Sequence, residues 1–213
     1  MIVYGASMSP FVRKVLAFGA EKGMALEHVS LGLGSDDPGF LEASPFRKIP
    51  GFRDGDFAIS DSSAIIAYLD AVQPEPNLIP TEPKARARTI WYDEFADTIL
   101  MSCGAKMFFN RVVAPRFLGR EGDLAAADKA ECDELPPLLD YIEKVLPDSG
   151  WLVEDRLTLA DLAVASPLVN LGHLGVDYAA GRPKLAAFAA KMLARDSFRP
   201  WVEKETAFLQ RAA

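Results

Sequence analysis

The sequence contains few cysteines and few histidines, and both shortages exclude classes of site. Its 213 residues include only two cysteines, Cys103 and Cys132, which are far apart and form no Cys-x-x-Cys pattern. Two such cysteines provide no disulfide framework and fit a reducing compartment. The two histidines, His28 and His173, have no partners at the spacing of metal ligands, so we expect no metal site.

The sequence also has few positively charged residues relative to acidic ones, and it has no long apolar run. Lysine and arginine number 23 against 30 aspartates and glutamates, which gives a formal net charge of −7. A nucleic-acid-binding protein would need a basic surface to offset phosphates, so we expect no nucleic acid partner. No apolar run approaches the roughly 20 residues of a membrane span, and the first residues form no signal peptide. We therefore expect no membrane association and a cytoplasmic location.

The first seventy residues alternate between strand-like and helix-like patterns. Apolar or alternating runs predict strands at 1–4, 26–31, 49–52 and 57–59, and helical spacing predicts helices at 10–22, around 40–42 and at 62–70. Asp54-Gly55, between the last two strands, is a strong hairpin signal. This order suits one small, mixed, four-stranded sheet covered by helices.

A proline-rich stretch at 73–83 cannot form a regular element and indicates a linker. The chain after it has helical patterns throughout. Helices are predicted at 84–118 with Gly104 as a candidate bend, 123–145 with an interruption near Pro136-Pro137, 159–171, 183–195 and 198–211. Thr158 and Asp161 have the spacing of a capping box. We therefore expect an α/β unit at 1–75 and an all-helical unit at 84–213.

Ser9 directly precedes the first predicted helix and is a candidate catalytic residue. Serine suits the N-cap position, and Pro10 suits the first helical position. A capping serine accepts a backbone N–H through its oxygen, and its own hydroxyl proton stays free to donate. That proton and the helix dipole both favour an anion in front of the helix, such as a thiolate. Capping alone also explains this serine.

Lys48-Ile49-Pro50 opens the third predicted strand. Pro50 has no N–H for a sheet ladder, which places it at a strand start or edge, and it holds Ile49 extended. The N–H and C=O of Ile49 are then available to a peptide-like ligand that pairs as an added strand. An ordinary strand-initiating proline explains the same pattern.

Ser60-Asp61-Ser62-Ser63 precedes the helix predicted at 62–70. A cap from one of these residues is the simplest interpretation. Free N–H groups of the first turn and the Ser62 hydroxyl could also bind a carboxylate, while Asp61 could pair with an ammonium group. Together, the three motifs describe one ligand with a thiolate, a peptide group and an α-amino acid end.

The order and spacing of these motifs resemble the glutathione transferase family, in its serine-using branches: Ser-Pro-Phe follows the first strand, and Ile-Pro and then Asp-Ser come later in the chain. The resemblance extends through the proline linker and the helical half. It implies a thioredoxin-like first unit, glutathione as co-substrate and a homodimer. The implied activity is conjugation of the glutathione thiolate to a small hydrophobic electrophile, as in detoxification.

The resemblance also implies a role for each candidate residue. The Ser9 hydroxyl would stabilise the thiolate, with Arg13 four residues later as in serine-type members, and Ser7 is the alternative. Ile49 would bind the cysteinyl backbone beside a cis Pro50, Asp61 and Ser62 would bind the γ-glutamyl end, and Lys48 would approach the glycyl carboxylate. Many members have a glutamate where this chain has Asp61, which is one methylene shorter.

Several alternatives remain open at this point. A glutathione-dependent isomerase, peroxidase or thioether lyase would use the same ligand site, and a non-catalytic interaction protein would share the fold. No cysteine occupies the start of the first helix, which argues against a thiol-disulfide reductase. Phe117, Trp201 and Phe208 are candidate walls of an acceptor pocket, although spaced apolar residues are more often core.

Overall fold

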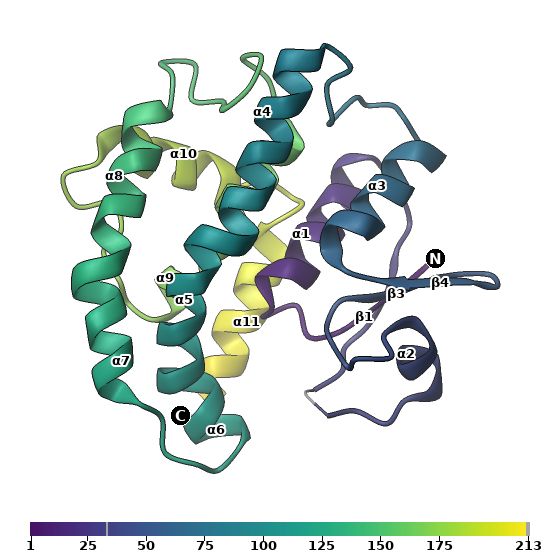
Figure 1. Ribbon diagram of the computed structural model, residues 1–213, viewed down its shortest axis with the longest axis horizontal. Helices are drawn as coiled ribbons and strands as arrows, with labels where there is room; N and C mark the ends of the chain where they lie inside the picture. Colours follow the sequence, from purple (N-terminus) through teal and green to yellow (C-terminus); the bar gives the residue numbers. More distant parts are fainter. Residues whose placement is uncertain (33, 212–213) are drawn as a thin grey trace.

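The computed structural model describes residues 1–32 and 34–211, and Figure 1 shows a small sheet with its helices beside a larger group of helices. Strands β1 (Ile2–Tyr4), β2 (Glu27–Val29), β3 (Gly51–Asp54) and β4 (Phe57–Ser60) form a sheet in the order β2-β1-β3-β4. β1 is parallel to β2 and antiparallel to β3, and β4 is antiparallel to β3. The predicted mixed, four-stranded sheet is confirmed.

Helices cover both faces of this sheet (Figure 1). α1 (Pro10–Glu21) and α3 (Ser62–Val72) lie on one face, and the short α2 (Pro38–Ala43) lies on the other. Successive side chains of a strand point to opposite faces. Val3 therefore joins the large core with α1 and α3, whereas Tyr4 packs against Phe40 of α2. Because helices cover both faces, a ligand can approach this sheet only at its ends or edges.

The segment 73–82 forms no helix or strand, as predicted for a linker, and the described chain after it is mostly helical. The elements are α4 (Pro83–Glu94), η1 (Phe95–Leu100), α5 (Met101–Phe108), η2 (Phe109–Val113), α6 (Ala114–Phe117), α7 (Leu124–Lys129), η3 (Ala130–Glu134), α8 (Leu135–Val145), α9 (Leu159–His173), α10 (Pro183–Leu193) and α11 (Arg199–Arg211), where η marks π-helical geometry. No helix in the described ranges has the length and apolar run needed to cross a membrane.

The helices predicted at 84–118 and 123–145 are both irregular, but the first is not irregular at the residue that was predicted. Gly104 lies inside regular α5, and the π-helical segments η1 and η2 occur on either side of it. The π-helical segment η3 ends at Glu134, two residues before Pro136 of the proline pair that was expected to interrupt the helix. Prolines remove the N–H groups that the preceding turn would bond to, which accounts for the change of geometry there.

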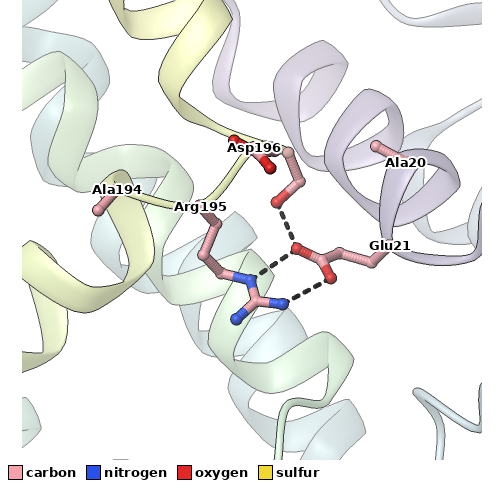
Figure 2. A pocket seen from close by; sticks show the side chains of 6 residues that line it. Ala20, Glu21, Ala194, Arg195 and Asp196 are labelled. Atoms are coloured by element: carbon pink, nitrogen blue, oxygen red, sulfur yellow. Dashed lines mark hydrogen bonds and ion pairs between the residues drawn. The ribbon is translucent and has the colours of Figure 1, made fainter.

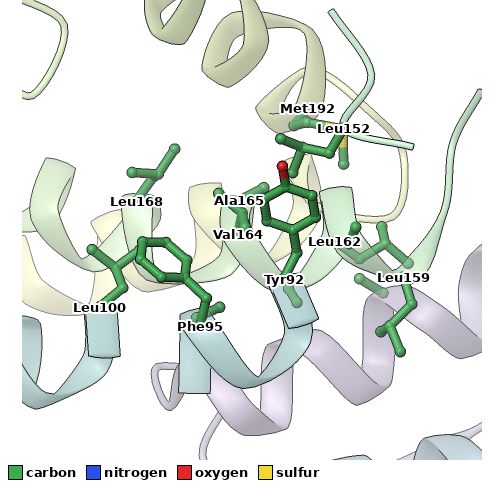
Figure 3. Close-up of a cluster of buried hydrophobic side chains, with 14 of the residues drawn as sticks. Tyr92, Phe95, Leu100, Leu152, Leu159, Leu162, Val164, Ala165, Leu168 and Met192 are labelled. Carbon is green, nitrogen blue, oxygen red and sulfur yellow. The ribbon is translucent and has the colours of Figure 1, made fainter. Parts of the chain in front are cut away.

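α9 is the central buried helix of the fold. Every residue from Leu159 to Leu171 is buried, and the helix packs against α1, α4, α5 and α10. Figure 3 shows Tyr92 and Phe95 among the side chains packed against it. The predicted capping box is present: an Asp161 oxygen accepts the Thr158 N–H at 2.8 Å, and its other oxygen accepts the Leu152 N–H at 2.9 Å.

Candidate functional site

The three motifs lie at one end of the sheet because of the strand register. Tyr4, the last residue of β1, pairs with Gly51, the first residue of β3, and Gly51 pairs with Ser60, the last residue of β4. These three residues therefore form a row across the sheet, with neighbouring strands about 4.8 Å apart. The loop after Tyr4 leads to Ser9, and Ser60 is followed directly by the start of α3. The topology thus places the three motifs at the same end of the sheet.

Ser9 occupies the N-cap position of α1 but does not cap it with its side chain. Its backbone is extended, with φ −72° and ψ 125°, and Pro10 takes the first helical position. The Ser9 carbonyl accepts the Arg13 N–H at 3.0 Å. The expected side-chain cap is therefore wrong, since the proline and this backbone bond already fix the helix start. The partly buried Ser9 hydroxyl has no hydrogen-bond partner within residues 1–32 and 34–211.

Ser7, the alternative to Ser9, is directed toward the protein interior. It is buried, and its hydroxyl interacts with the buried Glu205 of α11. Burial raises the pKa of Glu205, but hydrogen bonds from His173, Arg13 and Ser7 and the charge of Arg13 more than offset it and hold the pKa below its usual value. Ser7 is thus buried on the side of Glu205, whereas the Ser9 side chain is partly exposed.

The Ile49–Pro50 peptide bond is cis, as the resemblance implied. Neither the N–H nor the C=O of Ile49 forms a hydrogen bond with any described part of the chain. Gly5, which the sequence analysis did not single out, lies directly behind this residue. Its φ is +130°, and an added Cβ would stand 2.8 Å from the Ile49 Cβ. A glycine is therefore required where the end of β1 meets this segment.

Lys48 is exposed, and only its backbone is held by the fold. Its N–H donates to the Ser44 hydroxyl at 2.9 Å, and that hydroxyl donates to the Lys48 carbonyl at 2.6 Å. No hydrogen bond or ion pair involves its ammonium group in the part of the chain that the structure covers. The side chain is thus available to an anion, but the structure gives it no fixed direction.

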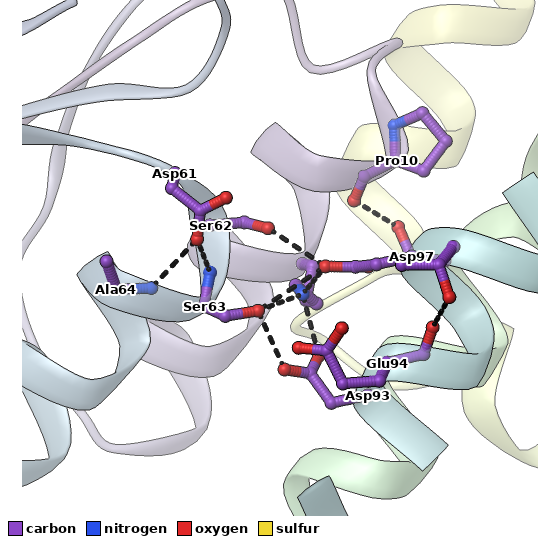
Figure 4. A network of polar contacts seen from close by, with 11 residues as sticks. Pro10, Asp61, Ser62, Ser63, Ala64, Asp93, Glu94 and Asp97 are labelled. Carbon is purple, nitrogen blue, oxygen red and sulfur yellow. Dashed lines mark hydrogen bonds and ion pairs between the residues drawn. The ribbon is translucent and has the colours of Figure 1, made fainter. Parts of the chain in front are cut away.

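Asp61 caps α3 and uses one of its two carboxylate oxygens to do so (Figure 4). Oδ1 accepts the N–H groups of Ser63 at 3.0 Å and Ala64 at 3.1 Å. These two first-turn N–H groups are therefore not free, contrary to expectation, because the aspartate itself satisfies them. The N–H of Ser62 has no partner among the residues placed by the structure, and Oδ2 of the exposed Asp61 also remains available.

The Ser62 hydroxyl belongs to a buried polar network that the sequence analysis missed. It donates to Asp97 of η1 at 3.3 Å, while Ser63 donates to Asp93 of α4 at 2.8 Å. Lys14 of α1 lies between the two carboxylates, at 2.6 Å from Asp93 and 2.5 Å from Asp97. Figure 4 shows Ser62 and Ser63 at the start of α3 facing Asp93 and Asp97.

The pKa of Asp97 in this network is raised above its usual value. Burial raises its pKa, the charge of Lys14 opposes the rise, and the charge of Asp93 adds to it. The four-residue spacing of Asp93 and Asp97 could have indicated a shared helix face. Lys14, by contrast, is one of several charged residues on α1, and only the fold shows that it is buried.

Two cavities lie elsewhere on the molecule. One, of about 410 Å³, is at the C-terminal end of α1, where the Glu21 carboxylate accepts Arg195 Nε at 2.6 Å and the Ser197 hydroxyl at 2.5 Å (Figure 2). A helix of this length spans about 18 Å, so the cavity is remote from Ser9. The other, of about 480 Å³, is lined by Asn110, Arg111, Pro115, Glu121, Gly122, Leu124 and Asp128. Within the described ranges, no cluster of three His, Cys, Asp or Glu side chains could hold a metal ion.

Comparison with known proteins gives one consistent result. Residues 3–77 match the family model "Glutathione S-transferase, N-terminal domain", and residues 114–205 match "Glutathione S-transferase, C-terminal domain". A glutathione S-transferase of Hyoscyamus muticus is 31% identical over 95% of this chain and 98% of its own. A glutathione S-transferase structure from Rhodospirillum rubrum superposes with a TM-score of 0.87 at 26% identity, over 94% of this chain and 90% of that one. Another, from Methylobacterium radiotolerans in complex with glutathione sulfonate, gives 0.78 at 26% identity, over 94% and 93%.

Proposed function

The chain belongs to the glutathione S-transferase family, and from this premise we propose that it conjugates glutathione to a hydrophobic electrophile, with Ser9 stabilising the thiolate. The observation that carries the proposal is the row formed by Tyr4, Gly51 and Ser60. It brings a serine at a helix start, the unpaired backbone groups of Ile49 before β3 and an acid–serine pair to the same end of one sheet. A tripeptide is the ligand that would engage all three at once.

Each part of glutathione has a chemically matched group at this end of the sheet. The unpaired N–H of Ser62 and the second oxygen of Asp61 suit the carboxylate and ammonium of the γ-glutamyl end. The N–H and C=O of Ile49 suit the cysteinyl backbone, and the exposed Lys48 suits the glycyl carboxylate. The relative from Methylobacterium radiotolerans was crystallised with glutathione sulfonate, which supports the same use of this fold.

The proposed chemistry needs the thiol of glutathione as an anion. The Ser9 hydroxyl would donate to the sulfur, and the N-terminus of α1 would stabilise its charge through the helix dipole. A hydrogen bond to a charged group contributes about 1.5–3 kcal/mol, which corresponds to a pKa decrease of about one to two units. The thiolate would then attack the electrophilic carbon, forming an S–C bond while a leaving group departs with its electron pair. No side chain forms a covalent intermediate.

The acceptor side of the proposal rests on α11 and α6. Phe208 of α11 stacks on Phe117 of α6 with ring centroids 5.9 Å apart, and both rings are partly exposed. Phe208 lies three residues after Glu205, on the same side of the helix. Since Glu205 binds Arg13 directly, the stacked pair lies about one helical turn from the contact with α1. An aromatic surface at this place favours a hydrophobic acceptor.

Replacement of Ser9 by alanine tests the proposal. The thiol pKa of bound glutathione should rise by about one to two units, and conjugation below that pKa should slow by about 10- to 100-fold. The thiolate absorbance of the complex gives the pKa, and an aromatic halide gives the rate. Ser7→Ala is the matched control. Unchanged values for Ser9→Ala, with loss in Ser7→Ala, would transfer the role to Ser7.

Two further measurements separate the remaining alternatives. Retention on immobilised glutathione distinguishes a glutathione-dependent enzyme from an interaction protein that only shares the fold. A panel of electrophiles assayed beside peroxide reduction, isomerisation and thioether cleavage then identifies the reaction. Loss of retention in an Asp61→Ala variant would support the γ-glutamyl assignment, and full retention would contradict it.

The proposal includes a homodimer in the cytoplasm. Phe46 is 85% exposed, in the loop between α2 and β3, and such a side chain gains stability when a second subunit covers it. Cys103 and Cys132 are both free thiols, which fits a reducing compartment. Light scattering of the native protein and of Phe46→Ser tests the dimer, which the variant should weaken.

A further inference from the structure

The backbone on both sides of Ser9 is held by side chains from α9. Asn170 Nδ2 donates to the Met8 carbonyl at 3.0 Å, and the Ser166 hydroxyl donates to the Pro10 carbonyl at 2.7 Å. Both donors are almost fully buried, and they lie 156 and 162 residues away from their acceptors in the sequence. The peptide units that flank the proposed catalytic serine are thus fixed from the helical part of the chain.

Arg13 determines which way the Asn170 amide faces. Its Nη1 donates to Asn170 Oδ1 at 3.0 Å and to the Ser166 carbonyl at 2.7 Å, while its Nη2 bonds to Glu205 at 2.7 Å. A guanidinium has only donors, so the amide must present its oxygen to Arg13 and its NH₂ group to Met8. Arg13 is fully buried and its charge is neutralised by Glu205, so this orientation is enforced rather than optional.

This arrangement matters because no hydrogen bond to the described residues orients the Ser9 hydroxyl itself. Its position relative to a bound sulfur depends on where Met8 and Pro10 are held. A displacement of about 1 Å can lower a catalysed rate about 100-fold. We infer that Asn170 and Ser166 are positioning residues for Ser9, through which the helical part of the chain completes the thiolate site. This inference rests on the proposed function of Ser9.

Two substitutions remove the contacts with little change in shape. Asn170→Asp keeps the oxygen that faces Arg13 and replaces the donor that faces Met8 with an acceptor. Ser166→Ala removes the donor to Pro10 and a longer contact at 3.3 Å from Arg13 Nη1, and it leaves the main-chain carbonyl that accepts from the same nitrogen at 2.7 Å. Asn170→Asp also adds a negative charge near the thiolate, whereas Ser166→Ala changes no charge. An effect shared by both variants therefore reports position and not charge.

The readouts are the thiol pKa of bound glutathione, kcat, and KM for glutathione. In both variants we expect the pKa to rise by about half to one unit and kcat below that pKa to fall by about three- to tenfold. KM for glutathione should change by less than about twofold, because the groups at Ile49 and Asp61 are not altered. A purely structural role would lower the melting temperature and leave the thiol pKa unchanged.

Thr89→Val is the matched control. Thr89 is fully buried, and among the residues that the structure covers its hydroxyl bonds only to the Ala85 carbonyl of the same helix, at 2.9 Å. The control should lose stability without a change in thiol pKa. Thiol pKa values in Ser166→Ala and Asn170→Asp equal to that of Thr89→Val would overturn the inference. If Asn170→Asp does not fold, Ser166→Ala decides alone.

The same series distinguishes the inference from the proposed function. A wild-type protein that does not bind glutathione, or a Ser9→Ala variant with an unaltered thiol pKa, overturns the proposed role of Ser9. A normal Ser9→Ala response together with no response in the two α9 variants overturns only the positioning role.

Discussion

Removal of the Lys14 charge should destabilise the protein strongly, and this prediction can be worked out from the buried network. Lys14 and Asp93 are 1% and 2% exposed, and Asp97 is 17% exposed. Lys14→Met keeps the length of the side chain but leaves two carboxylates facing one another without a cation. Loss of one partner from a buried ion pair costs about 3–5 kcal/mol. For a chain of this size the melting temperature should fall by about 6–20 °C.

The effect should depend on pH in a defined direction. Without the ammonium group, each carboxylate raises the pKa of the other, and burial already raises that of Asp97. When the pKa of a carboxyl group is higher in the folded state than in the unfolded state, the free energy of unfolding falls as the pH rises from the unfolded-state value to the folded-state value. The difference in free energy of unfolding between Lys14→Met and wild type should therefore be larger at pH 7 than at pH 5.

Urea unfolding followed by tryptophan fluorescence at the two pH values measures this difference. Lys106→Met is the matched control, because Lys106 and Glu134 are also 2.7 Å apart but their side chains are 47% and 35% exposed. An exposed pair contributes only about 0–1 kcal/mol. Addition of Asp93→Asn to Lys14→Met should restore part of the loss. Equal, pH-independent losses in the two lysine variants would refute the reasoning.

Three other predictions concern single residues. Burial raises the pKa of Asp161 to about 6, so between pH 4 and 6 this group is protonated in the folded state and ionised in the unfolded state, which lowers the free energy of unfolding as the pH rises. Asp161→Asn removes this effect, so the free energy of unfolding of the variant, measured by urea titration, should increase with pH more steeply than that of wild type, by up to about 1.4 kcal/mol per pH unit. Gly5→Ala should displace Ile49 and raise KM for glutathione, whereas Gly55→Ala, also at positive φ but with open space around its Cβ, should not. A thiol reagent should modify the exposed Cys132 at once and Cys103 only on unfolding, since burial and the charge of Glu134 raise the Cys103 pKa to about 11.

The strands of the sheet and the positions of the motifs along the chain were predictable because each is marked by one or two neighbouring residues in the sequence. Asp54-Gly55 marks the hairpin, and it connects two antiparallel strands in the structure. Pro50 marks a strand start, and β3 begins one residue later. Each signal is a backbone constraint imposed by one or two neighbouring residues, so it does not depend on the rest of the fold.

The polar contacts around the site were not predictable in the same way. Lysine and arginine are residue types that usually lie on the surface, and the burial of Lys14 and Arg13 depends on partners 79 and 192 positions away in the sequence. The capping role of Ser9 was wrong for a different reason. Ser9 has the preferred cap residue type, but Pro10 already fixes the helix start, so the hydroxyl remains unused. The residue type of Ser9 correctly predicted that it lies at the N-cap position, but it incorrectly predicted a hydrogen bond from its side chain to the helix backbone.

The two adjacent cations of α1 have a practical consequence for chimeric enzymes. Arg13 finds its counter-ion on α11, and Lys14 finds its own on α4 and η1. The first 77 residues, expressed alone, would expose both cations and lose the groups that hold the backbone around Ser9. Exchange of the helical half with that of a relative would preserve the start of α1 and the proposed glutathione site only if the incoming half supplies counterparts of Asp93, Asp97 and Glu205 at the same places.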